Sequence, residues 1–347
     1  MQPINTALCS FGISGRVFHA PFIVANPHFN LYAVWERTKN NVEEKYPQVK
    51  IFRTLKEILE DDKIELVIVN TPNYTHYEYT KKALLADKHV IVEKPFTVTI
   101  DEGKELIELA EKQNKKLSVY QNRRYDSDYK TIKKILEEKL LGNLVEAEFH
   151  FDRYSENLSP KIHKEVPGPG TGSLYDLGSH LIDQALQLFG IPEALFADIR
   201  IVRPASQVDD YFNLLLYYPQ LRVNIKSSYL VKEALPGYIL HGTKGSFLKS
   251  KTNIQEEMLQ KGEVPTKADW GTEPESEWGF LNTENNGRMI KEYIKSERGN
   301  YGDYYNGMYN AIRNNKQVPV SAKDGLNVIK VIEAAFKSVK LKRIVKL

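Results

Sequence analysis

Cysteine is almost absent from this sequence of 347 residues, in which Cys9 is the only one. One thiol excludes an internal disulfide and argues against a structural zinc site. The sequence also lacks any run of about 18 consecutive apolar residues, so a membrane-spanning helix is not expected. Its N-terminus has no charged segment followed by an apolar one, as secretory leaders have. These absences predict a cytoplasmic protein with a reduced thiol.

Excess charge of either sign is small as well. The chain has 48 basic and 45 acidic residues, for a formal net charge of +3. This balance gives no reason to expect nucleic acid or a membrane surface as a partner. A hydrophobic content of 41% and a charged content of 27% are ordinary for folded proteins, and the length exceeds that of one typical domain.

The stretch Leu8–Pro21 joins a short apolar run to glycines at positions 12 and 15 and then to a helical pattern. Such a pattern is typical of a first strand that turns sharply into a helix, where glycine lets the backbone approach a pyrophosphate at the helix N-terminus. Ser10 replaces the first glycine of the usual G-x-G-x-x-G pattern. By itself the pattern fits an ordinary glycine-containing turn equally well.

The following hundred residues alternate between strand-like and helical patterns. Residues 30–35 form a β-like run that ends in Glu36-Arg37-Thr38-Lys39, at the roughly 20-residue distance from the glycines where dinucleotide folds keep their ribose-reading residue. Further strands are expected at 66–70, 89–93 and 116–120, with helices at 54–61, 74–86 and 101–114.

This alternation predicts right-handed β-α-β units and a parallel sheet covered on both faces, within a dinucleotide-binding domain of residues 1–122. Ligands bind outside the carboxyl ends of such strands. The polar segments Thr71–Asn73 and Glu93–Pro95 fall at those ends.

Residues 123–347 have a different pattern and form the second predicted domain, for substrate binding and oligomerisation. A polar helix at 127–140 is followed by runs that alternate apolar and polar residues, as half-buried, largely antiparallel strands do. These strands are expected at 144–151, 194–203, 210–217, 221–229, 237–241 and 245–249, with hairpin turns at Pro219-Gln220 and Gly242–Gly245. One sheet face would lack helices, so a second copy is expected to cover it in a homodimer or homotetramer.

Two irregular segments interrupt this domain. The Gly/Pro-rich loop at 155–172 fits either an active-site rim or a plain connector. The polar segment 250–283 is expected to wrap around a neighbour or the cleft.

A helix predicted at 173–189 carries Asp176 and His180, whose i, i+4 spacing places both side chains on one face. A carboxylate can fix the tautomer of an imidazole and raise its basicity, and a lysine such as Lys94 can bind a developing oxyanion. The same spacing is typical of a simple hydrogen-bonded pair. Together with the dinucleotide fold it favours a hydride-transfer enzyme. His19, His28, His163 and His241 show no ligand spacing to one another, so no metal is expected.

Five motifs in this order resemble one known family. They are Ser14–Pro21, Thr-Pro-Asn-x-x-His at 71–76, Glu-Lys-Pro at 93–95, Asn-Arg-Arg-Tyr-Asp at 122–126 and Asp-Leu-Gly-Ser-His at 176–180. The sequence is similar to the Gfo/Idh/MocA oxidoreductases, the glucose-fructose oxidoreductase and inositol dehydrogenase family. Within that family it resembles the bacterial branch that includes NADP-dependent scyllo-inositol dehydrogenases, on the stretch Gly15–Pro21 and the loop 255–271.

The resemblance implies a Rossmann dinucleotide-binding domain followed by an α/β domain with an open, mainly antiparallel mixed sheet. It also implies an NAD(P)-dependent dehydrogenase or reductase acting on CH-OH groups, with Lys94 as catalytic lysine and Asp176 and His180 as acid/base pair. The implied cofactor-binding residues are Gly12, Ser14, Gly15, Arg16, Glu36, Arg37, Thr71, Pro72, Asn73, His76, Glu93 and Asn122.

The choice of cofactor depends on the residues after the second strand. A carboxylate such as Glu36 normally takes the ribose hydroxyls of NAD and repels a 2′-phosphate, whereas Arg37 can fork onto that phosphate. The residues therefore favour NADP over NAD. Two alternatives remain open, an NAD-dependent glycosidase on the same fold and a non-catalytic NADP-sensing regulator, and the regulator would be expected to lose Lys94 or His180.

The implied substrate is a sugar or a cyclitol, which needs several groups to hold its hydroxyls. Each candidate for this role fits a surface or interdomain contact equally well. The candidates are Arg124, Arg153 and Tyr154, and also Asp152, Asn157 and Tyr305.

Overall fold

The computed structural model describes residues 2–285 and 287–347, and its chain forms two compact units. The first contains residues 2–122, 255–270 and 300–326, and the second contains 123–254, 271–285, 287–299 and 327–347. The division after residue 122 recurs, but two later segments pack with the first unit. An aromatic cluster accounts for this, since the Phe22 ring lies 5.9 Å from Trp270 and 5.9 Å from a parallel Tyr305 ring.

The first unit contains the predicted parallel sheet, in the order β3-β2-β1-β4-β5-β6. This is the order of doubly wound dinucleotide-binding folds, and it reverses direction between β1 and β4. The strands are β1 (Ile4–Leu8), β2 (Phe29–Trp35), β3 (Lys50–Phe52), β4 (Leu66–Val69), β5 (His89–Glu93) and β6 (Leu117–Tyr120).

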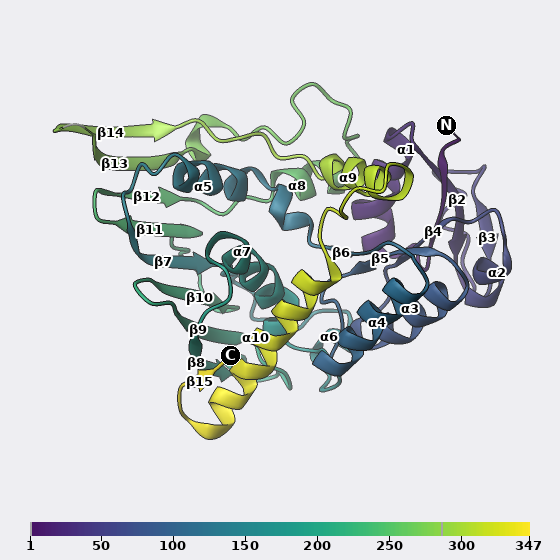
Figure 1. Ribbon diagram of the computed structural model, residues 1–347, viewed down its shortest axis with the longest axis horizontal. Coiled ribbons are helices and arrows are strands. Elements are labelled where there is room, and N and C mark those ends of the chain that lie inside the picture. Colours follow the sequence, from purple (N-terminus) through teal and green to yellow (C-terminus); the bar gives the residue numbers. More distant parts are fainter. Residues whose placement is uncertain (1, 286) are drawn as a thin grey trace. The chain divides into compact units, whose positions relative to one another are not determined.

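Helices cover both faces of this sheet. Figure 1 shows α3 and α4 together on one face and α1 with α9 on the other. Thr54 and Thr99 begin α2 and α4 with capping boxes, in which the threonine hydroxyl and a glutamate three residues later satisfy each other's backbone amides. The helices are α1 (Ala20–Ala25), α2 (Leu55–Glu60), α3 (His76–Leu85), α4 (Ile100–Lys112), α8 (Ile254–Gln260), α9 (Gly302–Arg313) and the start of α10 (Ala322–Leu341).

The second unit contains a mixed sheet in the order β14-β13-β12-β11-β7-β10-β9-β8-β15, in which only β7 and β10 pair in parallel. Both predicted hairpin turns are confirmed, between β9 and β10 and between β11 and β12. The strands are β7 (Leu144–His150), β8 (Ala194–Arg200), β9 (Tyr211–Tyr217), β10 (Arg222–Ser228), β11 (Tyr238–Gly242), β12 (Gly245–Lys249), β13 (Gly279–Asn285), β14 (Arg288–Ile294) and β15 (Val345–Lys346).

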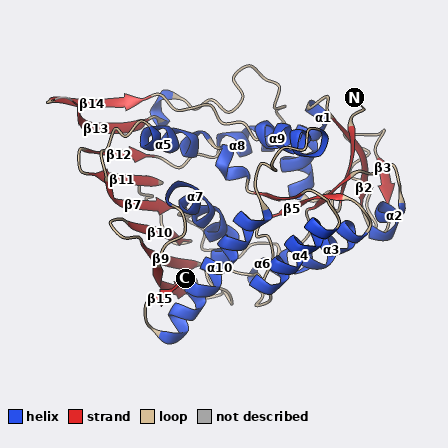
Figure 2. Ribbon diagram, viewed as in Figure 1, coloured by secondary structure: helices blue, strands red, loops and turns tan. Residues whose placement is uncertain are grey.

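One face of the mixed sheet carries the helices of this unit, α5 (Ser127–Glu137), α6 (Ile162–Glu165), α7 (Ser179–Phe189) and the rest of α10. Figure 2 shows these blue helices on one side of the red strands, and within the described part of the unit no helix lies over the other side. The strand register aligns a row of side chains across that uncovered face. The row is Phe196, Leu215, Asn224, Glu148, Ile239, Leu248, Phe280 and Tyr293.

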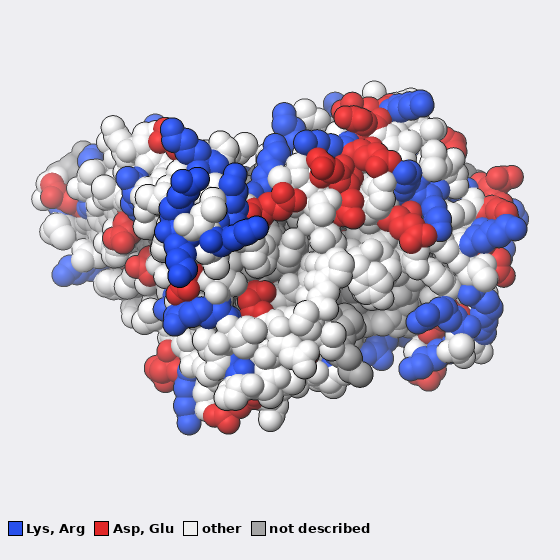
Figure 3. Space-filling model, turned by 90° about the horizontal axis from the view of Figure 1, so that it is seen from below, with Lys and Arg blue, Asp and Glu red and all other residues white. Residues whose placement is uncertain are grey.

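The segment 250–283 is more regular than its polar composition indicates, because it contains α8 and most of β13. No helix in the described part of the chain is long and apolar enough to cross a membrane. Figure 3 shows acidic and basic side chains interspersed on one face, with a group of Lys and Arg on its left half. That face therefore carries both signs of charge, in line with the balanced composition.

Candidate active site

A pocket of about 460 Å³ opens in the first unit at the carboxyl ends of β1, β2 and β4. These strands flank the point where the strand order reverses, which is where open α/β sheets bind ligands. Its lining residues are Cys9, Ser10, Phe11, Gly12, Trp35, Glu36, Arg37, Thr38, Lys39, Asn41, Thr71, Pro72, Tyr74, Thr75 and Tyr79.

The contacts in the turn after β1 explain why glycine is required there and why serine is accepted at position 10. A Cβ atom on Gly15 would lie 2.3 Å from the Ser10 carbonyl oxygen, so only glycine fits at 15. The Ser10 hydroxyl accepts a hydrogen bond of 3.3 Å from the Gly12 amide, which stabilises the turn in place of the missing glycine. A Cβ on Gly12 would meet only this hydroxyl, at 3.6 Å, so glycine at 12 keeps the pocket open rather than relieving an internal clash.

Asn70, directly after β4, supports the turn after β1. Its Nδ2 donates to the Ser10 carbonyl oxygen over 2.8 Å, whereas its buried Oδ1 has no hydrogen-bond partner among the described residues. A buried amide oxygen without a donor is costly. The open space at Gly12, which lines the pocket, fits a dinucleotide held by this turn.

The loop after β2 presents Arg37, Thr38 and Lys39 as exposed lining residues. Glu36 is only 6% exposed, and its two carboxylate oxygens accept hydrogen bonds from the amides of Asn41 and Val42 at 3.2 and 3.0 Å. The oxygens that would hold ribose hydroxyls are thus engaged by the main chain.

Some of the residues predicted after β4 line the pocket, and others lie in a short helix or in the interior. Thr71 and Pro72 line the pocket, whereas Asn73 begins the short helix η2 (Asn73–Thr75). His76 is fully buried, with Nδ1 2.7 Å from the Pro95 carbonyl oxygen and Nε2 2.9 Å from that of Thr71. Burial lowers the pKa of His76. The ring connects the loop after β4 to the loop after β5.

Glu93, at the end of β5, is the centre of a buried polar chain. Its Oε1 accepts a 2.5 Å hydrogen bond from the Ser14 hydroxyl and lies 3.0 Å from His19 Nε2. His19 Nδ1 lies 2.7 Å from the Tyr305 hydroxyl. Burial opposes ionisation of Glu93, but the contacts with His19 and Ser14 hold its pKa below the ordinary value. Burial raises the pKa of Tyr305.

In this chain of contacts, two side chains that were expected to contact a ligand contact other protein groups instead. The Ser14 hydroxyl, expected at a phosphate, donates to Glu93, and Tyr305, considered for substrate contact, is buried beside His19. His19 lies within the motif Ser14–Pro21, but nothing in the sequence indicated its contact with Tyr305, which is 286 positions away.

Lys94 follows this carboxylate directly. The Lys94 amide donates to Glu93 Oε2 over 3.2 Å, and the Lys94–Pro95 peptide bond is cis. Glu93 therefore holds both the π-helical segment η1 (Ser14–His19) and the backbone of Lys94. Of the other predicted cofactor residues, Arg16 is exposed on η1 and Asn122 is buried after β6.

In the second unit, Asp176 and His180 lie on one helical stretch, as predicted. Asp176 is in the π-helical segment η4 (Leu174–Gly178), which continues into α7, where His180 is 7% exposed. Single π-helical turns inside α-helices are frequent at functional sites. The Asp176 carboxylate also forms a 2.7 Å ion pair with Lys164 of α6, and this carboxylate raises the pKa of Lys164. The spacing of residues in the sequence did not indicate that Lys164 pairs with Asp176.

The loop that carries α6 is anchored by Arg203. Its guanidinium pairs with Asp210 at 2.8 Å and with Glu165 at 3.1 Å, and it donates to the Asn157 carbonyl oxygen at 2.9 Å. Arg203 is only 3% exposed, so this anchor is buried. It fixes the part of the Gly/Pro-rich loop next to Lys164.

The predicted substrate residues divide into buried and exposed ones. Arg124 forms a two-bond contact with Asp183 of α7, at 2.7 and 2.6 Å. Asp152 is also tied down, because it accepts a 3.0 Å hydrogen bond from the Ser228 amide. Arg153 and Tyr154 are exposed beyond β7, with the Arg153 guanidinium 5.3 Å from the Phe151 ring centre. Asn157 is exposed as well, so Arg153, Tyr154 and Asn157 are the members of this set with side chains accessible to a ligand.

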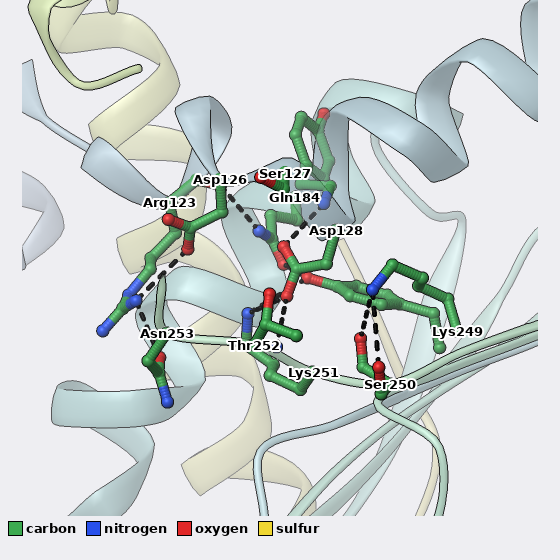
Figure 4. A network of polar contacts seen from close by, with 12 residues as sticks. Arg123, Asp126, Ser127, Asp128, Gln184, Lys249, Ser250, Lys251, Thr252 and Asn253 are labelled. Carbon is green, nitrogen blue, oxygen red and sulfur yellow. Dashed lines mark hydrogen bonds and ion pairs between the residues drawn. The ribbon is translucent and has the colours of Figure 1, made fainter. Parts of the chain in front are cut away.

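A polar network next to Arg124 joins the segment before α5 to the segment after β12 (Figure 4). Arg123 donates to Asp126 at 3.2 Å and to Asn253 at 2.8 Å, while Asp128 pairs with Lys251 at 3.0 Å. Lys249 forms a fully buried ion pair with Glu273, of 2.8 Å. Buried charges persist only when they are paired in this way. The network therefore fixes the backbone that carries Arg124.

Two family profiles match this sequence and cover nearly all of it. The NAD-binding Rossmann fold of an oxidoreductase family matches residues 4–121, and the C-terminal alpha/beta domain of the same family matches residues 133–347. The chain belongs to the Gfo/Idh/MocA oxidoreductase family. The predicted fold class is confirmed, and the protein is an oxidoreductase.

Relatives of this Gfo/Idh/MocA chain match at least 97% of its length. The scyllo-inositol 2-dehydrogenase (NADP(+)) IolW of Bacillus subtilis is 37% identical over 100% of this chain and 97% of its own. The uncharacterized oxidoreductase YdgJ of Escherichia coli is also 37% identical, over 97% of this chain and 96% of its own. A crystal structure of a candidate oxidoreductase from Bacteroides fragilis is 48% identical, covers 99% of this chain and 100% of its own, and superimposes with a TM-score of 0.92.

Proposed function

We propose that this protein is an NADP-dependent dehydrogenase or reductase that acts on a secondary alcohol or ketone of a sugar or cyclitol. The observation that carries the proposal is the loop after β2. There Arg37 and Lys39 line the pocket while the Glu36 carboxylate is engaged by backbone amides. This arrangement favours a 2′-phosphate over a free ribose hydroxyl. The name of the Bacillus subtilis relative, an NADP-dependent scyllo-inositol dehydrogenase, supports the same choice.

The residues that would hold NADP are those of the pocket. The turn Ser10–Gly15 would take the pyrophosphate at the helix N-terminus, Arg37 the 2′-phosphate, and Thr71 and Pro72 the adjoining part of the nucleotide. When bound, the nicotinamide supplies the hydride acceptor or donor.

The acid/base chemistry belongs to Lys94, Asp176 and His180. His180 takes the proton of the substrate hydroxyl, and Asp176 orients the imidazole. The Lys94 ammonium binds the reacting oxygen and stabilises negative charge as it develops. Lys164 forms a 2.7 Å ion pair with Asp176 and so helps to fix the position of that carboxylate. Arg153 and Tyr154 are the proposed contacts for the substrate's other hydroxyls.

A panel of polyols and ketoses, assayed by the absorbance change of NADPH and of NADH, tests this function. We expect turnover of a cyclitol or sugar with NADP, and slower turnover with NAD. Cofactor binding without turnover of any compound would instead indicate a regulator. Release of a free sugar from a glycoside, without net change in NADPH, would indicate a glycosidase.

We also propose that a second copy of the chain covers the open face of the mixed sheet. Most of the aligned row on that face is apolar, and Phe196 and Tyr293 are 40% and 64% exposed. At its centre, the buried Asn224 Oδ1 has no hydrogen-bond partner among the described residues. A matching face of a second protomer would bury the apolar ends and bring donors to the centre.

A further inference from the structure

The loop after β2 is held on its inner side by Glu36. The Glu36 carboxylate lies under the loop and accepts hydrogen bonds from the amides of Asn41, at 3.2 Å, and Val42, at 3.0 Å. At 6% exposure the residue is buried, so these amides serve in place of water as donors to its oxygens.

Arg53, directly after β3, holds the same loop from its outer side. Its Nη1 donates to the carbonyl oxygens of Glu36, at 2.8 Å, and Lys39, at 2.7 Å. Its Nη2 donates to Asn40 Oδ1 at 2.6 Å. A planar guanidinium can make these bonds together because its donors are fixed in a fork.

Between these two supports lie Arg37, Thr38 and Lys39, which are exposed and line the pocket. The cationic groups of Arg37 and Lys39 form no ion pair with any residue that the structure describes. Their backbone, in contrast, is fixed at both ends. A loop held in its binding conformation binds an anion without the entropic cost of ordering it.

We infer that Glu36 and Arg53 are positioning residues that make this pocket selective for adenosine nucleotides carrying a 2′-phosphate. The inference rests on the proposed use of NADP. A carboxylate that binds the ribose hydroxyls favours NAD, whereas Glu36 in this loop favours a nucleotide with a 2′-phosphate. It supports the loop whose cations attract the phosphate, and Arg53 completes that support without touching the ligand.

Titration calorimetry of the full-length protein with 2′,5′-ADP and with 5′-AMP tests this inference. Glu36→Gln replaces one accepting oxygen with a donor, and Arg53→Lys keeps the charge but loses the fork. Because fewer molecules would hold the binding-competent loop, each variant should bind 2′,5′-ADP about tenfold more weakly. Its affinity for 5′-AMP should stay within about twofold of the wild type. Lys56→Gln on α2, an exposed lysine paired with Glu60, is the matched control and should change neither affinity.

Amide hydrogen exchange supplies a second readout that does not depend on a ligand. Exchange at Asn41 and Val42 should be faster in both variants and unchanged in Lys56→Gln. If Glu36→Gln loses 5′-AMP binding and keeps or gains 2′,5′-ADP binding, Glu36 is a ribose ligand and the inference is wrong. Arg53→Lys tests the outer support separately, even if Glu36→Gln does not fold. If Arg53→Lys keeps the wild-type affinity for 2′,5′-ADP and the wild-type exchange at Asn41 and Val42, the inference is also wrong. A wild type that binds both nucleotides equally would reject the proposed use of NADP itself.

Discussion

The two sheets differ in the number of faces that helices cover, and their side chains differ accordingly. All four residues of β4 are buried, as are all four of β6. In β9 of the mixed sheet, buried residues alternate with partly exposed ones along the whole strand. A parallel sheet joined by crossover helices is enclosed on both faces, whereas a sheet built from hairpins can leave one face open.

The same difference decides where functional groups lie. All strands of the parallel sheet point the same way, so the segments after β1, β2 and β4 meet at one edge and form the pocket. The mixed sheet has no such edge. Its candidate acid/base residues lie on the helical stretch over one face, and Lys164 reaches Asp176 from a long loop.

The largest expected effects test whether each unit supplies part of the chemistry. His180→Ala should lower turnover by roughly 10²–10⁴-fold and remove the pH dependence due to its ionisation. Lys94→Ala should lower kcat by roughly 10²–10³-fold with little change in cofactor affinity. Steady-state rates on the substrate found in the panel measure both, with Lys82→Ala, an exposed lysine paired with Glu78, as the control. Near-wild-type turnover of either variant would assign that residue a structural role.

A smaller effect, on stability, should follow from breaking the buried polar chain of Glu93, His19 and Tyr305. His19→Ala leaves Glu93 without its imidazole partner and should cost about 2 kcal/mol of stability at neutral pH. The folded-state pKa of Glu93 lies below its ordinary value of 4.5, so its contribution is present above that pH and is lost as the pH falls through the lowered pKa. The stability difference between wild type and variant should shrink over the same range.

Urea unfolding at neutral and acidic pH measures this difference. His28→Ala is the matched control, since His28 is an exposed histidine of the same unit that stacks on Tyr309 at 4.0 Å. A difference that is independent of pH would show that His19 contributes by packing and not by its contact with the carboxylate.

Cofactor choice tests the edge of the parallel sheet. Arg37→Ala should weaken NADP binding by about tenfold, because a charge-assisted contact with the phosphate is lost, and should affect NAD far less. Fluorescence titrations with both cofactors measure the two affinities. Equal losses for NADP and NAD would contradict the assignment of Arg37 to the 2′-phosphate.

The smallest effect on catalysis is expected at the open face of the mixed sheet. Leu215→Arg places a charge in the aligned row and should convert an oligomer to monomers while the fold is retained. Light scattering at micromolar concentration measures the assembly. Leu85→Arg, at a 56% exposed position on α3 of the first unit, should leave it unchanged. A monomeric wild type would refute the proposed assembly.

Local sequence patterns determined the class of both sheets and much of the pocket. Short apolar runs such as 66–69 and alternating ones such as 211–217 report how many faces of a strand are buried. Of the residues that line the pocket, Gly12, Glu36, Arg37, Thr71 and Pro72 were predicted because they follow recognisable strands. The weak periodicity of 250–283, in contrast, concealed α8 and β13.

Only the tertiary structure decided which distant residues meet. It brought His19, Glu93 and Tyr305 together, paired Lys164 with Asp176, and packed residues 255–270 and 300–326 with the first unit. It also turned the Glu36 carboxylate toward backbone amides. Periodicity records which side of an element is buried, but the partner of a buried polar group depends on the path of the whole chain, and local spacing does not encode that path.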